Sequence, residues 1–386
     1  MPDPDGAPGR RDDRSSRRPS RGSTSPASGG GRAPGPAGSG RDAPLFGALD
    51  LGTNNCRLLI ARPARDGFRV VDSFSKIVRL GEGLSQTGRL DDAAMDRAYD
   101  ALASCAERVV RKGLDSDRLS AVATQACRQA ENGEAFIERV RRGTGLRLRI
   151  IDPAEEARLS VVGCVTLFDP ASEAYLVIDV GGGSTELSWI RRRGGETETV
   201  GWISAPLGVV TLAERHPEPR DATEAAYEGW YEAMVGDMGA AIATGGFADA
   251  ELSTLFSEGR GHMVGTSGAI TSLAGIHLRL PRYQRDRIDG LWMSRAQCEA
   301  AAERLKAMGP AGRAAEVCIG PDRADLVLAG AAILEAVQRA WPCERVRVAD
   351  RGLREGLLLQ KMRESRKPKR RRSRRRRGQG AGAAEG

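Results

Sequence analysis

A glycine-rich turn between two apolar segments carries the clearest chemistry in the sequence. Its four residues are Gly181, Gly182, Gly183 and Ser184. A glycine costs about 1 kcal/mol relative to alanine inside regular structure, so an ordinary turn rarely needs three in succession. Close approach of the backbone to a phosphate explains them, and the flanking Asp179 and Glu186 can share a Mg²⁺. A purely structural turn is the alternative.

A second turn with related chemistry lies near the start of the chain. An apolar run that begins at Leu45 ends at Asp50 and is followed by Gly52, Thr53 and Asn54. A carboxylate at the end of a strand can hold hydrated Mg²⁺ while backbone N–H groups approach phosphate oxygens. This pattern predicts Asp50 as a metal ligand, and Thr53 and Asn54 as phosphate ligands. An ordinary hairpin turn is the alternative.

Glu156 lies at the start of an expected helix. Asp152 suits the N-cap, Pro153 the first helical position, and Glu155 the returning half of a capping box. Glu156 is rotated by about a hundred degrees from Glu155, and the cap does not need it. It is therefore free to face a cleft, with a solvated carboxylate near the helix dipole as the alternative.

Two further segments can bind anions. Arg128 follows an expected strand, a position that presents a guanidinium fork to phosphate, and a surface arginine is the alternative. Residues 264–271 form a loop of small residues that opens a helix, so that Gly265 and Ser267 can bind an anion through N–H groups. Tight packing of that helix is the alternative.

The elements that must position these residues alternate between strand and helix. We expect strands at seven places: 45–51, 57–62, 69–74, 119–124, 146–151, 175–180 and 186–190. A helix is expected over 91–112, because Asp91 can cap it and apolar residues recur on one face. Two copies of a strand–turn–strand unit, each followed by helices, predict two related α/β lobes.

Composition separates the two ends of the chain from its core. Residues 1–44 are rich in Gly, Pro, Ser and Arg, and the tail at 364–386 holds 10 Lys or Arg and 2 Glu, so both are expected to be disordered. The lobes are expected at 45–159 and 160–363. These carry a net charge of −3, because the total is +8 and the two ends carry +3 and +8. A polyanion in the core must therefore be held by locally placed arginines and amides.

Length and composition also limit the class of protein. The 386 residues exceed what one core usually supports. No apolar run approaches the roughly 20 residues that cross a bilayer, and no apolar stretch typical of a secretory signal follows the first arginines. We therefore expect a cytoplasmic protein without membrane contact. Seven scattered cysteines without a C-x-x-C pair, and three distant histidines, favour neither a disulfide framework nor a zinc site.

Together these motifs resemble those of the exopolyphosphatase and guanosine pentaphosphate phosphohydrolase family, within the actin-like superfamily and in its short, two-lobed form. The resemblance covers roughly residues 45–362 and rests on six motifs: 50–55, 79–84, 128–130, 155–159, 178–186 and 353–356. It implies two ribonuclease H-like lobes with mixed β-sheets flanked by helices, and an active site in the cleft between them. The chain departs from the usual family pattern at three places. It has Asp152-Pro153 where the family usually has Ser-Gly, and Asn55 where the family usually has Ser or Thr. It has Ala349 where Ser is common.

The resemblance also implies an activity. It implies hydrolysis of the terminal phosphoanhydride of inorganic polyphosphate or guanosine pentaphosphate with Mg²⁺, by a protein that we expect to be a homodimer. Glu156 is then the catalytic base, Arg128 and the turn 181–184 bind phosphate, and Asp179 with Glu186 lies on the magnesium side.

Two other functions stay open. A kinase of the same superfamily transfers phosphate from ATP to a hydroxyl of a small molecule, but it more often uses an Asp near the acceptor than a residue such as Glu156. The second is a protein that binds RNA or another polyanion without catalysis. The basic tail predicts contact with nucleic acid or polyphosphate that weakens steeply with salt.

Overall fold

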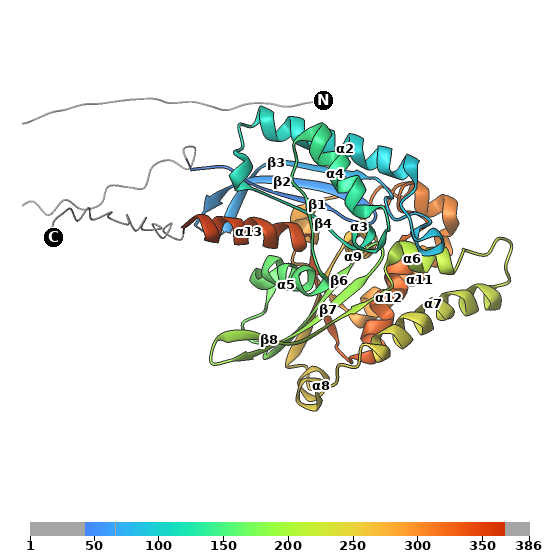
Figure 1. Cartoon of the computed structure of the whole chain (residues 1–386). Helices are drawn as coiled ribbons and strands as arrows, with labels where there is room; N and C mark the ends of the chain where they lie inside the picture. Colours follow the sequence, from blue (N-terminus) through green and yellow to red (C-terminus); the bar gives the residue numbers. More distant parts are fainter. Residues whose placement is uncertain (1–42, 66, 367–386) are drawn as a thin grey trace, which may run out of the picture. The chain divides into compact units, whose positions relative to one another are not determined.

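Two mixed β-sheets, each covered by helices, make up the part of the chain that the computed structural model describes, residues 43–65 and 67–366 (Figure 1). The segments predicted to be disordered, 1–44 and 364–386, lie almost wholly outside these residues. A membrane-spanning segment is not found among the described helices. The described α-helices are α1 (Leu84–Thr87), α2 (Asp92–Arg111), α3 (Gln125–Gln129), α4 (Gly133–Thr144), α5 (Pro153–Cys164), α6 (Val209–Arg215), α7 (Glu224–Thr244), α8 (Ala250–Ser257), α9 (Gly268–His277), α10 (Arg285–Ile288), α11 (Arg295–Ala315), α12 (Val327–Ala340) and α13 (Leu353–Arg366).

The first sheet has five strands in the order β3-β2-β1-β4-β5. They are β1 (Phe46–Leu51), β2 (Asn55–Ala64), β3 (Gly67–Ile77), β4 (Leu119–Ala123) and β5 (Arg149–Ile150). β1 runs parallel to β4, so the segments that follow these two strands emerge at the same edge. Alternate side chains of β1 face two cores: Leu49 and Leu51 pack with α2 and α4, whereas Ala48 packs with α13.

The second sheet has six strands in the order β10-β11-β9-β6-β7-β8. They are β6 (Ala174–Val180), β7 (Thr185–Arg193), β8 (Glu196–Ala205), β9 (Gly261–Thr266), β10 (Trp292–Ser294) and β11 (Arg345–Ala349). Leu176 and Ile178 of β6 face a core shared with α7, α9, α11 and α12. The opposite face of this sheet contacts α5. The predicted architecture of two mixed sheets flanked by helices is confirmed.

The predicted strands occur near their expected positions, with one large difference. The strand expected at 146–151 is reduced to β5, Arg149–Ile150. Leu146 and Leu148 are instead buried in the core beside α4, so core packing accounts for their apolar pattern. The helix expected over 91–112 is α2, and Asp91 caps it by accepting a hydrogen bond from the N–H of Ala94 at 3.0 Å.

The path of the chain differs from two consecutive lobes divided at residues 159 and 160. α5 runs across that boundary, and α13 returns to pack against β1, β2 and α5 (Figure 1). Leu159 of α5 joins Leu357 and Leu358 of α13 in one core on the first sheet. The last described helix therefore covers one face of the first sheet. The predicted domain boundaries stay a prediction.

Glycines allow α5 and α13 to cross at close range. A Cβ on Gly356 would lie 2.0 Å from the carbonyl oxygen of Leu159, and one on Gly163 would lie 2.0 Å from that of Gly352. α5 contacts both sheets, so the spacing of this helix pair affects the join between them.

Gly356→Ala is expected to lower the free energy of unfolding by about 1–3 kcal/mol, because the added methyl group forces the two helices apart. Gly236→Ala in α7 is the matched control, since no atom lies within 4 Å of its added Cβ. That variant is expected to gain up to about 1 kcal/mol. Urea unfolding measures both changes, and equal stability of the two variants would contradict tight packing at the crossing.

Candidate active site

A pocket of about 620 Å³ opens between the two sheets. Its walls include the segments that follow β1, β6, β9 and β11. β6, β9 and β11 are parallel neighbours, so their carboxyl ends meet at one edge, where α/β sheets commonly bind ligands. The first sheet supplies the turn after β1.

Most of the predicted site residues line this pocket. They are Asp50, Thr53, Asn54, Glu156, Asp179, Gly181, Gly182, Gly183, Ser184 and Ser267. Arg128, Glu186 and Gly265 are not part of the lining. The placement of Gly265 in a loop is wrong, because β9 continues to Thr266 and α9 begins only at Gly268.

The two glycine-containing turns meet at this pocket. A Cβ on Gly182 would lie 2.9 Å from the Cβ of Thr53, and one on Gly183 would lie 2.0 Å from Oε1 of Gln125. The close approach of the two turns therefore requires glycine at 182, whereas the space beside Gly183 is filled by the side chain of Gln125 from α3. None of 181–183 has a positive φ. Within the described residues, the N–H groups of residues 53, 54 and 182–184 have no hydrogen-bond acceptor. Such unused backbone donors suit an anion.

The start of α5 separates its two glutamates. Asp152 caps the helix as predicted, accepting from the N–H of Glu155 at 2.8 Å. The returning half of the capping box does not form, because Glu155 accepts from Arg149 Nη2 at 2.6 Å instead. Charge-assisted bonds of this kind are stronger than a bond to a neutral N–H. Glu156 is 8% exposed and lines the pocket.

Arg128 does not line the pocket but contacts Glu156, which does. Its Nη1 lies 3.2 Å from Oε2 of Glu156 and donates to the carbonyl oxygen of Ile151 at 2.7 Å. Burial raises the pKa of Glu156 well above its usual range, and the charge of Glu186 adds to this, whereas Arg128 opposes it. A fixed carboxylate with a raised pKa is suited to accept a proton from water.

Three further carboxylates form the acidic side of the site. Glu186 lies behind the turn 181–184 and accepts from Ser184 Oγ and Ser204 Oγ, each at 2.8 Å. Asp179 accepts from Ser160 Oγ. Burial raises the pKa of Asp50 to about 6 and that of Glu186 to about 7, and the charge of Asp179 adds to both shifts.

Acidic side chains of the pocket offer oxygen ligands to Mg²⁺. The described ranges contain no group of three or more His, Cys, Asp or Glu side chains placed to hold a metal. Mg²⁺ needs no such group, since it keeps several waters and takes one or two carboxylates together with substrate phosphates. Asp50 and Asp179 line the pocket, and Oδ1 of Asp50 is buried without a hydrogen-bond partner, so these two fit. Glu186 already accepts from two serines and lies off the pocket.

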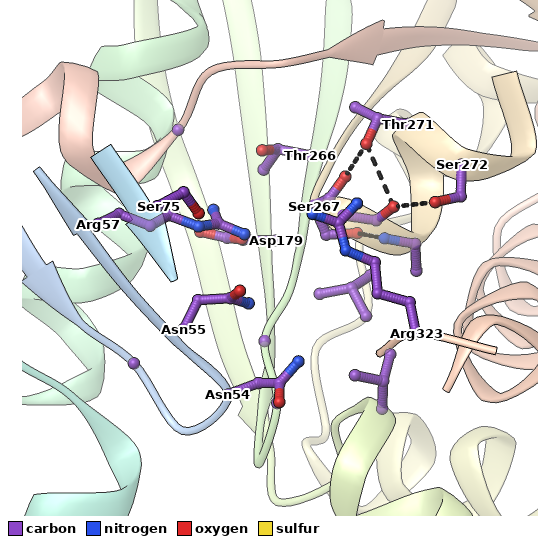
Figure 2. Close-up of a pocket in the computed structure, with 18 of the residues that line it drawn as sticks. Asn54, Asn55, Arg57, Ser75, Asp179, Thr266, Ser267, Thr271, Ser272 and Arg323 are labelled. Carbon is purple, nitrogen blue, oxygen red and sulfur yellow. Dashed lines mark hydrogen bonds between the residues drawn. The ribbon is translucent and has the colours of Figure 1, made fainter. Parts of the chain in front are cut away.

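Two arginines that sequence reasoning missed face the same pocket. Arg57 extends from β2, directly opposite Asp50 in register, and Arg323 extends from the segment before α12. Figure 2 shows their side chains reaching into the pocket from opposite walls. Neither guanidinium forms a hydrogen bond or salt bridge with another described residue. Burial lowers the pKa of Arg323, and the charge of Arg57 lowers it further, so an anion between them relieves a repulsion.

Asp50→Asn is expected to stabilise the metal-free protein at pH 7.5 by about 1–3 kcal/mol. The pKa of Asp50 is raised to about 6 in the folded protein, against about 4 in an unfolded chain. The folded state therefore binds more protons between these values, and its stability falls as the pH rises from about 4 to 6. Urea unfolding at several pH values measures this slope. Asp100→Asn, at an exposed position on α2, is the control, and an unchanged slope in Asp50→Asn would contradict the burial of this charge.

Two facing α/β sheets whose turns offer unused N–H groups to one pocket define the class of actin-like phosphate-transferring and phosphate-hydrolysing proteins. Comparison with known proteins narrows this class. The model of the Ppx/GppA phosphatase family matches residues 59–365, so the chain belongs to that family. The predicted enzyme class, a phosphohydrolase, is thereby confirmed.

Relatives and solved structures agree with this assignment. The chain is 30% identical over 322 residues to exopolyphosphatase 1 of Mycobacterium leprae, covering 82% of this chain and 89% of the relative. It is 28% identical to a guanosine-5'-triphosphate,3'-diphosphate pyrophosphatase of Photobacterium profundum, covering 84% of this chain and 60% of the relative. The crystal structure of the Aquifex aeolicus Ppx/GppA family member is similar with a TM-score of 0.66 and 25% identity, covering 84% of this chain and 99% of that one.

Proposed function

We propose that the chain is an exopolyphosphatase, which hydrolyses the terminal phosphoanhydride of inorganic polyphosphate or guanosine pentaphosphate. The observation that carries the proposal is the pair Arg57 and Arg323, two cations that form no hydrogen bond or salt bridge with another described residue and reach into the pocket that Glu156 lines. A chain of phosphates presents anions in a row, so it can contact these cations and the turns together. Relatives named for both substrates support this class.

In the proposed reaction, a water oxygen attacks the terminal phosphorus as the anhydride P–O bond breaks, and the shortened chain leaves with the electron pair. Glu156 orients the water and accepts its proton. Arg128 holds Glu156 in place. The unused N–H groups of residues 53, 54 and 182–184 stabilise negative charge on the phosphate oxygens. Mg²⁺, when bound by Asp50 and Asp179 together with phosphate oxygens, supplies further charge neutralisation.

A phosphate-release assay with Mg²⁺ tests this function. Purified full-length protein is given polyphosphate, guanosine pentaphosphate, or ATP with a mixture of small hydroxyl compounds. Release of free phosphate from either of the first two is the expected result, and omission of Mg²⁺ is expected to reduce it. Transfer of phosphate from ATP to a hydroxyl, without release from the other substrates, would favour the kinase instead.

We also propose a role for the basic tail. The basic tail is proposed to gather polyphosphate or nucleic acid, and because α13 ends at Arg366, the deletion that tests it removes residues 367–386. Salt-dependent polyanion binding that survives this deletion would exclude the tail as the site of that binding.

The cytoplasm is proposed as the compartment because all seven cysteines are free and buried. The homodimer stays a prediction.

A further inference from the structure

Arg79 has an unusual backbone conformation for its residue type. Its φ is 47°, in the left-handed region that favours glycine. A side chain there costs about 1–2 kcal/mol, so a glycine would be cheaper unless the side chain is needed. Arg79 does not line the pocket of about 620 Å³, and the proposed reaction gives it no role.

The backbone around Arg79 supports the first phosphate turn from behind. The N–H groups of Val78 and Arg79 both donate to the carbonyl oxygen of Asn54, at 2.8 and 3.1 Å. The N–H of Gly81 donates to the carbonyl oxygen of Thr53 at 2.9 Å. A displacement of this segment therefore moves Thr53 and Asn54, whose own N–H groups are free to bind phosphate.

The side chain of Arg79 reaches the other lobe. Its guanidinium donates to both carboxylate oxygens of Asp325, at 3.0 and 3.1 Å, and to the carbonyl oxygen of Asp322 at 3.2 Å. These two contacts lie on either side of Arg323 in the sequence. A two-pronged guanidinium contact fixes direction as well as distance. Arg79 thus holds both flanks of the short segment that presents Arg323 to the pocket.

A second contact ties the same segment to the second lobe. Glu214 of α6 accepts from the N–H of Gly83 and from Ser85 Oγ, each at 2.9 Å. The segment from 79 to 85 is therefore anchored at two separate points. This makes it a suitable support for the relative placement of the Thr53–Asn54 turn and Arg323.

We propose that Arg79 is a positioning residue that sets the distance between the first phosphate turn and Arg323, so that both contact the same phosphate chain. This inference rests on the proposed function. Arg79 does not touch the reacting atoms, and Glu156 with Arg128 lies outside the contacts that it makes. Its loss should therefore weaken substrate binding while the chemical step is largely retained.

Arg79→Gly and Asp325→Asn test this from both ends of the contact. Glycine accepts the φ of 47°, so the first variant removes the side chain without adding backbone strain. Each variant is expected to raise the KM for polyphosphate about 10-fold and to change kcat by less than about 3-fold. Arg89→Ala is the control, since it removes an exposed salt bridge to Glu131 within the first lobe, and its KM is expected to be unchanged.

A double-mutant cycle separates positioning from general stability. If Arg79 acts through Arg323, then adding Arg79→Gly to Arg323→Ala is expected to raise the KM by less than about 2-fold further. Fully additive effects, or a wild-type KM in both single variants, would overturn the inference. A wild-type protein that releases no phosphate from either substrate would instead overturn the proposed function, and the two failures are thus distinct.

Discussion

Glu156→Gln is expected to lower the turnover of polyphosphate by about 10²- to 10⁴-fold while polyphosphate binding stays nearly intact. The amide keeps the size of the side chain and can still accept a hydrogen bond from Arg128, but it cannot take a proton from water. Single-turnover phosphate release gives the chemical rate, and equilibrium binding at low temperature gives the affinity. Glu155→Gln is the matched control, because the neighbouring carboxylate pairs with Arg149. Equal turnover in Glu156→Gln and the wild type would remove the proposed base.

The pH dependence gives an independent check on the same residue. Burial and the charge of Glu186 raise the pKa of Glu156 above its usual range. Activity that needs the ionised form should therefore rise with pH through a limb well above the pKa of about 4.3 of an ordinary glutamate. Arg128 lowers this pKa, so Arg128→Gln is expected to move the limb to still higher pH. A limb that stays in place would show that another group controls it.

Local sequence signals predicted the parts of the fold that depend on nearby residues. The cap at Asp91, the end of β1 at the turn of Asp50, and the glycine turn after β6 follow from local chemistry and were found in place. Gly265 was misplaced because the run of small residues at 264–271 does not reveal where a strand ends and a helix begins. The return of α13 to the first sheet depends on tertiary packing, which no local pattern encodes.

In the candidate site, too, local sequence predicted some residues, whereas others depend on tertiary packing. Glu156 was separated from Glu155 by helix geometry alone, and both side chains lie on the sides expected for a rotation of about a hundred degrees. Arg57 left a usable signal, because side chains two residues apart on a strand share a face, and Asn55 already belonged to the motif 50–55. Arg323 left none, since it lies in an irregular segment, and its approach to the pocket depends on the meeting of two lobes. The contact of Arg128 with Glu156 likewise joins residues 28 positions apart.

Arg57→Ala and Arg323→Ala are each expected to lower kcat/KM for polyphosphate by about 10- to 100-fold, mainly through KM. Each loss removes a charge-assisted contact with the substrate, worth about 1.5–3 kcal/mol. The dependence of binding on salt should also become less steep. Arg285→Ala is the control, because this arginine lines the same pocket but is already paired with Asp350 at 3.1 Å, and a smaller loss is expected.

Without ligand, the stability of the Arg323 variant should change in the opposite direction to its activity. Arg323 is partly desolvated and repelled by Arg57, so removing the charge of Arg323 is expected to leave the thermal midpoint unchanged or to raise it. Arg57→Ala also removes the attraction of Arg57 to the buried Asp50 and Asp179, so this variant is expected to lower the midpoint. Polyphosphate, by contrast, should stabilise the wild type more than either variant, since only an intact pair gains both contacts. Thermal unfolding with and without polyphosphate measures both effects. If activity and ligand-free stability fall together in Arg323→Ala, this arginine supports the fold and does not bind the phosphate chain. If activity falls in Arg323→Ala while that stability is kept or gained, the repulsion between Arg57 and Arg323 is the feature that the substrate relieves.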